Sequence, residues 1–475
     1  MFFILAGTPQ IKPANTLAYF ASPEKFDPEL QRFLEDASSK LCTWLGEATR
    51  RGPLPALSDL PDVAPKKSGL SWDLLLDDFQ QIMDGAYQPS HPGAIAHLDP
   101  PPLTASIVAD LICAGLNNNL LAEELSPGLT KLEREVCRWF ADQLGLPPSA
   151  GGVAASGGTL SNLMALVLAR NAANLGTDSN AVVLASQDAH VSLAKAIRVM
   201  GLGVESLELV STNADGKMSI EALETHIALL KKQGRNCFAI VATAGTTVRG
   251  AIDPLEQIAA IAFRENIWLH IDGAIGGAFA LSSSTKSLVH GIGLADSVTL
   301  NPQKVLGITK TSSLLLVAQK ENLCTTFATG LPYIEPAWGD AHGGEMGLQG
   351  SRSAEILKLW IGLKQLGEDG IKQLLEGAID RRVYLEERID LSCFNLVSGP
   401  LHLVAFSPSN FDEHQSSQWS FSTRQTLLDN DLMLSRPVYR NRHYLKAVLG
   451  NPHTQITHLD ELAKTINKSL SGFSI

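Results

Sequence analysis

The sequence Ser297-Val298-Thr299-Leu300-Asn301-Pro302-Gln303-Lys304 combines a β-prone run with an abrupt stop. Proline has no N–H to donate to a strand ladder, so the strand has to end at Asn-Pro, directly before a lysine. A second run, Ile267-Trp268-Leu269-His270-Ile271, is nearly as apolar and ends in Asp272-Gly273-Ala274. Short, almost wholly apolar runs are typical of strands buried on both faces of a parallel sheet. Both stretches therefore predict buried strands with a charged residue at the carboxyl end.

The same texture extends outward along the chain. Short apolar runs alternate with helical patterns, and the runs are 181–185, 204–210, 238–243, 267–271, 297–300 and 313–317. Such alternation predicts an α/β fold with a mostly parallel sheet covered by helices on both faces.

Three regions follow from the remaining patterns. Residues 1–90 are rich in Pro, Asp and Ser, with helical patches at 28–45 and 70–83, and predict a helical arm that packs on a partner subunit. We assign residues 91–365 to a large domain and 366–475 to a smaller α/β domain, with helices expected at 354–366, 371–389 and 460–470. Within the large domain, residues 323–351 contain six glycines and two prolines, which predicts a long functional loop.

Composition excludes several classes of function. The 475 residues are 45% hydrophobic and 18% charged, and the net charge of −11 argues against broad binding of nucleic acid or anionic membranes. Six scattered cysteines without a CxxC pair predict neither a disulfide framework nor a metal site. No run of about twenty apolar residues predicts a membrane span, and the short apolar start lacks the basic residues of a signal peptide. We therefore expect a cytoplasmic protein.

Asp272 and Lys304 predict a particular cofactor. Pyridoxal phosphate needs an amine that tethers its aldehyde and an anion that keeps its ring nitrogen protonated. The alternative reading is two surface charges, but each residue follows a buried-looking strand, where an unpaired charge is costly. An enzyme that uses pyridoxal phosphate is thus the leading hypothesis.

Three further positions fit this cofactor. Ser156-Gly157-Gly158-Thr159 precedes a helix and would cradle a phosphate on free N–H groups, although it could also be an ordinary helix cap. His190 follows a strand and could stack on a flat ring, or simply cap a helix. The stretch Ala242-Thr243-Ala244-Gly245-Thr246-Thr247 ends another strand and places hydroxyls at the edge where parallel sheets bind ligands, or it belongs to a turn.

These residues also carry a family resemblance. From His91 to the C-terminus the chain resembles the group II pyridoxal-phosphate-dependent amino-acid decarboxylases, which act on glutamate, cysteine sulfinate, diaminobutyrate or aromatic amino acids. The matching segments keep their order and spacing: 116–127, 156–162, 186–201, 243–254, 270–277, 296–304, 348–360 and 451–452.

The resemblance implies a fold type I homodimer whose active sites form at the subunit interface. It implies that Lys304 holds the cofactor covalently, that Asp272 pairs with the ring nitrogen and that His190 stacks on the ring. The remaining implied cofactor contacts are Gly158, Thr159 and Asn301 at the phosphate, and Thr246 and Ala274 beside the ring.

Two departures from the family pattern concern catalysis. Gln303 replaces the usual histidine before the lysine and keeps a hydrogen-bond donor without a titrating group. The loop tyrosine that protonates the product carbon in relatives falls on Ala341, beside His342, while Tyr333 lies too early in the loop. Either His342 or Tyr333 is the acid, or slow protonation releases a carbonyl product; we favour His342.

The resemblance also implies substrate contacts at Asn119, Glu123, Arg352 and Lys446. Lys446 stands where glutamate decarboxylases have a carboxylate-binding arginine, and it keeps the charge without the bidentate fork. Glu123 replaces a tyrosine of those enzymes, and an additional carboxylate would favour a cationic side chain such as that of diaminobutyrate.

We therefore expect decarboxylation of an L-amino acid to its amine and CO2, with 2,4-diaminobutyrate, aspartate, glutamate or cysteine sulfinate as substrate and an aromatic amino acid as a further candidate. The alternatives are an aldehyde-forming oxidative decarboxylase or a transaminase on the same scaffold. A catalytically silent homologue is the rival from outside the enzymes, and the joint presence of Lys304, Asp272 and His190 argues against it.

Overall fold

The computed structural model describes residues 19–57, 59–331, 334–336, 338 and 341–472. The chain forms two compact units, residues 1–88 and 89–475. The first unit contains the helices α1 (Pro28–Gly46), α2 (Ala48–Arg51) and α3 (Trp72–Asp84). Asp27 caps α1 by accepting from two backbone N–H groups, and Pro28 fits the first helical position, where no N–H is needed. Stacking of Phe33 on Trp72, with ring centroids 4.2 Å apart, joins α1 to α3.

The second unit is built on a seven-stranded sheet in the order β1-β7-β6-β5-β4-β2-β3. Only β7 runs antiparallel to its neighbours, so the prediction of a mostly parallel α/β sheet is confirmed. The run 204–210 supplies a strand only from Leu207, because residues 204–206 form a 3-10 turn. The strands are β1 (Gly151–Ala155), β2 (Ala181–Ser186), β3 (Leu207–Val210), β4 (Asn236–Thr243), β5 (Trp268–Gly273), β6 (Ser297–Leu300) and β7 (Ser313–Val317).

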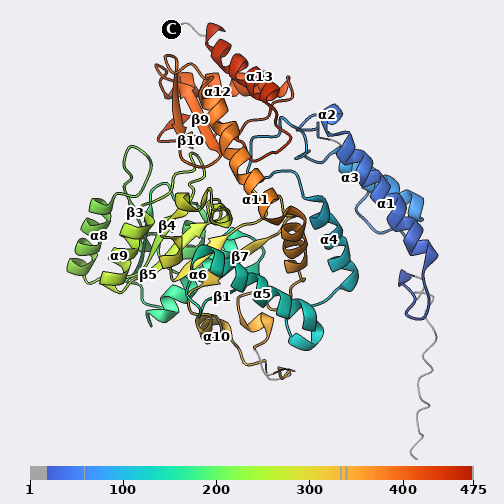
Figure 1. Cartoon of the computed structure of the whole chain (residues 1–475), viewed down its shortest axis with the longest axis horizontal. Helices are drawn as coiled ribbons and strands as arrows, with labels where there is room; N and C mark the ends of the chain where they lie inside the picture. The colour runs from blue at the N-terminus through green and yellow to red at the C-terminus, as the bar shows by residue number, and fades with distance from the viewer. Residues whose placement is uncertain (1–18, 58, 332–333, 337, 339–340, 473–475) are drawn as a thin grey trace, which may run out of the picture. The chain divides into compact units, whose positions relative to one another are not determined.

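Helices cover both faces of this sheet (Figure 1). Successive side chains of a strand point to opposite faces. Thus Val182 and Leu184 of β2 pack with α5 (Pro127–Leu144), α8 (Ile220–Gln233) and α9 (Leu255–Glu265). Ala181, Val183 and Ala185 instead meet α6 (Gly158–Ala172) and α7 (Ser192–Val199), while α10 (Glu321–Phe327) packs on α6. Burial on both faces explains why these strands read as continuous apolar runs.

A smaller sheet with its own core occupies the C-terminal part. Its order is β12-β9-β8, and Phe394, Phe406 and Trp419 are fully buried in its core. A hairpin of β10 (Val438–Tyr439) and β11 (Arg442–His443) lies outside this sheet. The remaining elements of this part are β8 (Phe394–Ser398), β9 (Leu403–Pro408), β12 (Leu445–Val448), α12 (Glu413–Leu428) and α13 (Ile456–Lys468).

The long helix α11 (Ile356–Glu386) contacts α4 (Thr104–Leu116) and α13 (Figure 1). The two helices expected here are present and run on from one another within α11, joined across a kink at Gly367, whose backbone is non-helical (φ 60°, ψ −177°). A positive φ is cheap for glycine, so one helix stops there and the next begins directly after it. The predicted domain boundary at residue 365 falls inside α11, and the division into a large and a small domain stays a prediction.

Within the described ranges, no helix is both long and apolar enough to cross a membrane. Nor do three or more His, Cys, Asp or Glu side chains of the described part of the chain gather as they would around a metal ion.

Candidate active site

One cavity of about 290 Å³ collects polar side chains at the carboxyl edge of the large sheet. The strands β1, β2, β4, β5 and β6 all end beside it, which is where parallel sheets bind ligands. It is lined by eight of the residues predicted from sequence, namely Gly158, Thr159, His190, Thr246, Asp272, Ala274, Asn301 and Lys304. Gln303 also lines it, with its side-chain oxygen accepting from the Ser312 N–H at 2.6 Å.

The turn between β1 and α6 forms one wall of the cavity. Gly157 has φ +135°, and α6 then begins at Gly158 without a side-chain cap, so its first N–H groups are available to a ligand. A Cβ on Gly158 would lie 2.8 Å from Nδ2 of Asn301. Ser313 donates to Oδ1 of Asn301 at 2.7 Å and so holds that side chain in place. Uncapped N–H groups, the helix dipole and the Asn301 amide together suit a phosphate.

Asp272 supplies the negative charge of the cavity. It is the penultimate residue of β5, is 6% exposed, and accepts from Nδ2 of Asn162 at 2.8 Å and from the Ala274 N–H at 3.2 Å. Hydrogen bonds to a carboxylate stabilise its charged form. A buried, ionised carboxylate of this kind is a suitable partner for a protonated ring nitrogen.

Lys304 supplies the positive charge. It follows β6 in a turn closed by its N–H bonding to the Asn301 carbonyl at 3.1 Å. Burial lowers the pKa of the Lys304 amine, and the charges of Asp272 and Asp99 act in the opposite direction. A lowered pKa leaves more of the amine neutral and nucleophilic, as a tethering lysine requires.

His190 lies at the exposed rim of the same cavity. The Ser192 N–H donates to Nδ1 of His190 at 3.2 Å and fixes the ring at the start of α7. Burial of the ring lowers the pKa of His190. The negative charge of Asp272 raises this pKa, and the positive charge of Lys304 lowers it. The imidazole is therefore mostly neutral at pH 7, and a neutral flat ring can stack on another.

An unsatisfied buried hydroxyl supports a fit to pyridoxal phosphate. Oγ1 of Thr243 lines the cavity and has no hydrogen-bond partner among the described residues, although buried polar groups are normally paired. Neighbouring Thr246 has its hydroxyl occupied by the Ala251 N–H at 3.0 Å. The cavity thus offers a phosphate-binding turn, an anion for the ring nitrogen and an amine for the aldehyde. These groups match the parts of pyridoxal phosphate, so the residues present fit this cofactor.

The structure places the predicted acid, His342, in a different cluster. Its ring is buried, with Nδ1 accepting from the Glu123 N–H at 3.3 Å and Nε2 facing the Ile334 carbonyl at 3.2 Å. Arg134 pairs with the Glu123 carboxylate at 2.9 Å. Neither His342 nor Glu123 lines the 290 Å³ cavity of its own chain. The alternative acid, Tyr333, lies outside the described residues.

Arg352 and Asn119 belong to the same neighbourhood. Both terminal nitrogens of Arg352 bond to the Glu133 carboxylate, at 2.5 and 2.6 Å. The Arg352 N–H also donates to Oδ1 of Asn119 at 3.3 Å, and Nδ2 of Asn119 donates to Ser351 at 3.2 Å. These two residues likewise do not line the 290 Å³ cavity.

Lys446 lies just behind the cavity. It is 7% exposed on β12, and its Nζ donates to the carbonyl of Thr247, a cavity-lining residue, at 3.2 Å. Burial lowers the pKa of Lys446 to about 8, with Lys304 contributing to the same effect. Its charge is therefore sensitive to pH close to neutrality.

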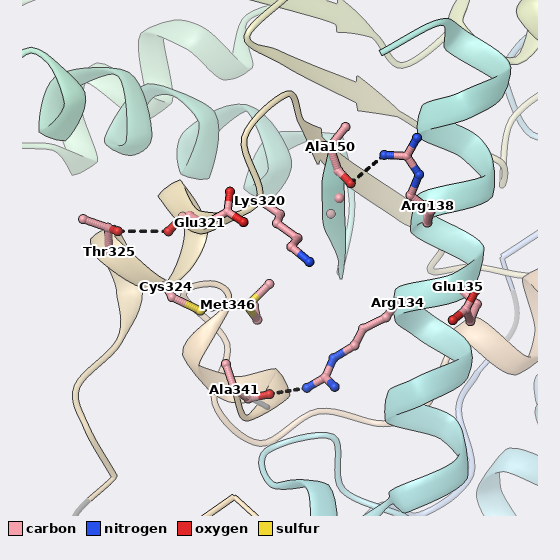
Figure 2. Close-up of a pocket in the computed structure, with 12 residues that line it drawn as sticks. Arg134, Glu135, Arg138, Ala150, Lys320, Glu321, Cys324, Thr325, Ala341 and Met346 are labelled. Atoms are coloured by element: carbon pink, nitrogen blue, oxygen red, sulfur yellow. Dashed lines mark hydrogen bonds between the residues drawn. The ribbon is translucent and has the colours of Figure 1, made fainter. Parts of the chain in front are cut away.

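A larger cavity of about 560 Å³ lies at the opposite end of β1 (Figure 2). Figure 2 shows Arg134 and Arg138 entering it from α5, and Lys320 pointing into it from the turn after β7. Arg138 is engaged by Asp142 and by three carbonyls, and Arg134 by Glu123 and the Ala341 carbonyl. None of the predicted cofactor residues lines this cavity, so its size does not make it the catalytic site.

Sequence reasoning gave no role to Asn162 and did not single out Thr243 among the hydroxyls at the end of β4. Asn162 is 1% exposed and lies one helical turn after Gly158, so helix periodicity could have placed it on the face that meets the cavity. Thr243 precedes Thr246 at the end of β4, and only its unpaired hydroxyl distinguishes it from an ordinary strand residue.

Comparison with known proteins adds independent findings. Residues 53–407 match the family described as the pyridoxal-dependent decarboxylase conserved domain. The chain is 30% identical over 443 residues to an L-2,4-diaminobutyrate decarboxylase of Rhizobium meliloti, covering 90% of this chain and 88% of that protein. It is 31% identical over 413 residues to the cysteine sulfinic acid decarboxylase of Homo sapiens, covering 83% and 81%. The crystal structure of mouse CSAD superposes with a TM-score of 0.85 at 25% identity, covering 94% of this chain and 99% of that one.

Proposed function

We propose that the 290 Å³ cavity is the catalytic site of this chain. The chain belongs to the pyridoxal-dependent decarboxylase family and is a pyridoxal-phosphate-dependent amino-acid decarboxylase. One observation carries this assignment: Asp272 and Lys304 line the same cavity, whose wall is the uncapped start of α6. The bound cofactor supplies an electron sink for the pair left behind when CO2 departs.

The residues divide the work as follows. Lys304 would hold the cofactor through its amine, which a lowered pKa leaves more often neutral and nucleophilic. Asp272 keeps the ring nitrogen protonated, and His190 covers one face of the ring. The phosphate is bound by Gly158, Thr159 and Asn301, and the ring is bordered by Thr246 and Ala274.

The substrate carboxylate or an acidic side chain is bound with the help of Lys446. Its buried cation behind Thr247 supports an acidic amino acid such as aspartate, glutamate or cysteine sulfinate. Glu123 and the similarity to a diaminobutyrate decarboxylase support 2,4-diaminobutyrate instead. The names of the relatives support plain decarboxylation rather than aldehyde formation or transamination.

The active enzyme is a homodimer in which a second copy completes each site. His342, Glu123, Asn119 and Arg352 serve the cavity of the partner in this proposal, with His342 as the acid that protonates the product carbon. The apolar stripe of α4 supports such a dimer, because Val108, Leu111, Ile112 and Leu116 are 48–60% exposed on one helical face. A cytoplasmic location is part of the proposal, supported by six free cysteine thiols.

The decisive experiment combines cofactor trapping with product analysis. Borohydride reduction of the holoenzyme followed by peptide mapping should find the cofactor attached to Lys304. Each candidate amino acid should then be tested for CO2 and for the matching amine in equal amounts. Label on any other lysine would overturn the site, and an aldehyde with ammonia in place of the amine would overturn the reaction.

A further inference from the structure

We propose that Asn162, His270 and Ser297 form a hydrogen-bond relay behind Asp272, in which every donor points toward the carboxylate and keeps it ionised and aimed at the cavity. The relay deepens the proposed function, since it rests on the assignment of Asp272 to the ring nitrogen. Its three members are positioning residues; of them only Asn162 borders the cavity.

The first link is the amide of Asn162. Its Nδ2 lies 2.8 Å from Oδ2 of Asp272 and 2.9 Å from Oγ of Ser192. An ionised carboxylate can only accept, so the nitrogen of the amide has to face Asp272. This fixes the orientation of the amide and leaves Oδ1 of Asn162 pointing away from the cavity as an acceptor.

The second link is the ring of His270. Its Nε2 lies 3.1 Å from Oδ1 of Asn162, and since that oxygen can only accept, Nε2 carries the hydrogen. Thr299 Oγ1, at 3.5 Å, is a weaker second neighbour of the same nitrogen. Complete burial lowers the pKa of His270 to about 4, against the effect of Asp272, so the ring is neutral at pH 7. A neutral ring with its hydrogen on Nε2 has a bare Nδ1.

The third link is the hydroxyl of Ser297. It lies 2.9 Å from Nδ1 of His270 and donates to it, because the other neighbour of Nδ1, the Ser297 carbonyl at 3.2 Å, cannot donate. The same oxygen accepts from Nε1 of Trp268 at 2.9 Å, and an indole can only donate. The direction is thus settled from Trp268 to Asp272.

The fold sets this alignment. Trp268, His270 and Asp272 alternate along β5 and point to the same face of the sheet. Ser297 of β6 is the register partner of His270, and α6 lays Asn162 over both strands. A parallel sheet covered on both faces normally carries apolar side chains inside, because buried polar side chains need hydrogen-bond partners. The polar side chains found here therefore call for a specific role.

The relay acts electrostatically on Asp272. Hydrogen bonds in a chain polarise one another, so each link strengthens the partial positive charge of the N–H that faces the carboxylate. This charge favours the ionised form of the carboxylate over its protonated form. The second N–H of Asn162 bonds to Ser192, whose own N–H holds His190. Asn162 therefore couples the anion below the ring site to the imidazole at its rim.

The test compares cofactor binding by the full-length apoenzyme. Asn162→Leu removes the donor to a charged group and should weaken pyridoxal phosphate binding about tenfold or more at pH 7. Ser297→Ala removes only the distant link and should weaken binding about two- to fivefold.

Controls separate positioning from packing. Ser206→Ala alters another fully buried serine, one outside the relay, and should leave the affinity unchanged. His270→Gln, whose amide can still donate to Asn162, should retain more affinity than His270→Leu. If Asn162→Leu fails to fold by circular dichroism, the Ser297 and His270 variants decide. Wild-type affinity in Ser297→Ala, with His270→Gln no better than His270→Leu, would overturn the relay.

The relay and the proposed function fail in different ways. Wild-type protein that does not bind pyridoxal phosphate at all would refute the catalytic site itself. Strong binding that Asp272→Asn weakens and the relay variants leave untouched would keep the site and remove only the relay.

Discussion

Arg352 and Glu133 form a bidentate ion pair in which the two terminal guanidinium nitrogens each donate to a different carboxylate oxygen, at 2.5 and 2.6 Å. Their side chains are 8% and 7% exposed. Arg352 also bonds through its backbone to Asn119 and through its side chain to the Gly343 carbonyl. The pair thus ties α5 to the loop that carries His342.

Breaking this pair should cost stability as well as activity. Removing one partner leaves a buried charge uncompensated, so Glu133→Gln should lower the free energy of unfolding by about 3–5 kcal/mol. Urea denaturation measures this loss. The exposed pair Lys464–Glu461 is the control, since Lys464→Ala should cost about 0–1 kcal/mol. Equal effects of the two substitutions would contradict a structural role for the buried pair.

A methyl group at Gly158 should weaken cofactor binding. The added Cβ would lie 2.8 Å from an Asn301 amide that Ser313 holds in place, so the phosphate cup has to distort. Gly158→Ala should raise the dissociation constant of pyridoxal phosphate about tenfold, measured by absorbance titration of the apoenzyme. Gly128→Ala, in α5, meets nothing within 4 Å and should bind normally. Unchanged binding in Gly158→Ala would show that the phosphate lies elsewhere.

The affinity for acidic substrates should fall as pH rises through about 8. Lys446 is cationic below its pKa of about 8 and neutral above it, so its attraction for a carboxylate is present at low pH and lost at high pH. KM measured from pH 6 to pH 9 should rise across this window. Lys446→Met should have a high KM without that rise, whereas exposed Lys468→Met should behave as wild type. A KM profile identical in wild type and Lys446→Met would exclude this role.

Hybrid dimers should test whether His342 serves the partner's cavity. Lys304→Ala and His342→Phe should each be nearly inactive. If each site draws these residues from different subunits, mixing the two proteins creates dimers with one intact site, and activity should recover to about a quarter of wild type. No recovery after verified subunit exchange would place both residues in the site of one chain. Full amine production by His342→Phe alone would remove His342 as the acid.

A charge on the exposed face of α4 should dissociate the dimer. Ile112 lies at the centre of the apolar stripe and is 50% exposed in the single chain. Ile112→Asp should yield the monomer mass in sedimentation analysis and lose activity in proportion. Phe263→Asp alters a residue that is 91% exposed on α9 and should leave the mass unchanged. A wild-type monomer, or a dimer insensitive to Ile112→Asp, would contradict this interface.

The fold and the cavity were predictable because both depend on local patterns. Apolar runs predict strands such as β5 and β6, and the charged residues at or just after the ends of these runs are Asp272 and Lys304. Gly158 was found from its place before a helix, whereas Asn301 as a phosphate contact came from the family resemblance. The two helices of α11 were also predictable, but the kink that joins them at Gly367 was not, since a glycine in a sequence permits several backbone conformations.

The amino-acid sequence alone determined the sheet, its covering helices and the pairing of an anion with an amine at one edge, because side-chain periodicity and strand ends are local properties of the chain. The tertiary structure decided the rest. It set Asn162 behind Asp272 and joined Arg352 to Glu133, residues 219 positions apart. It also placed His342 and Glu123 outside the cavity of their own chain. These relationships depend on which helix face meets which strand, and packing of the folded chain fixes that choice.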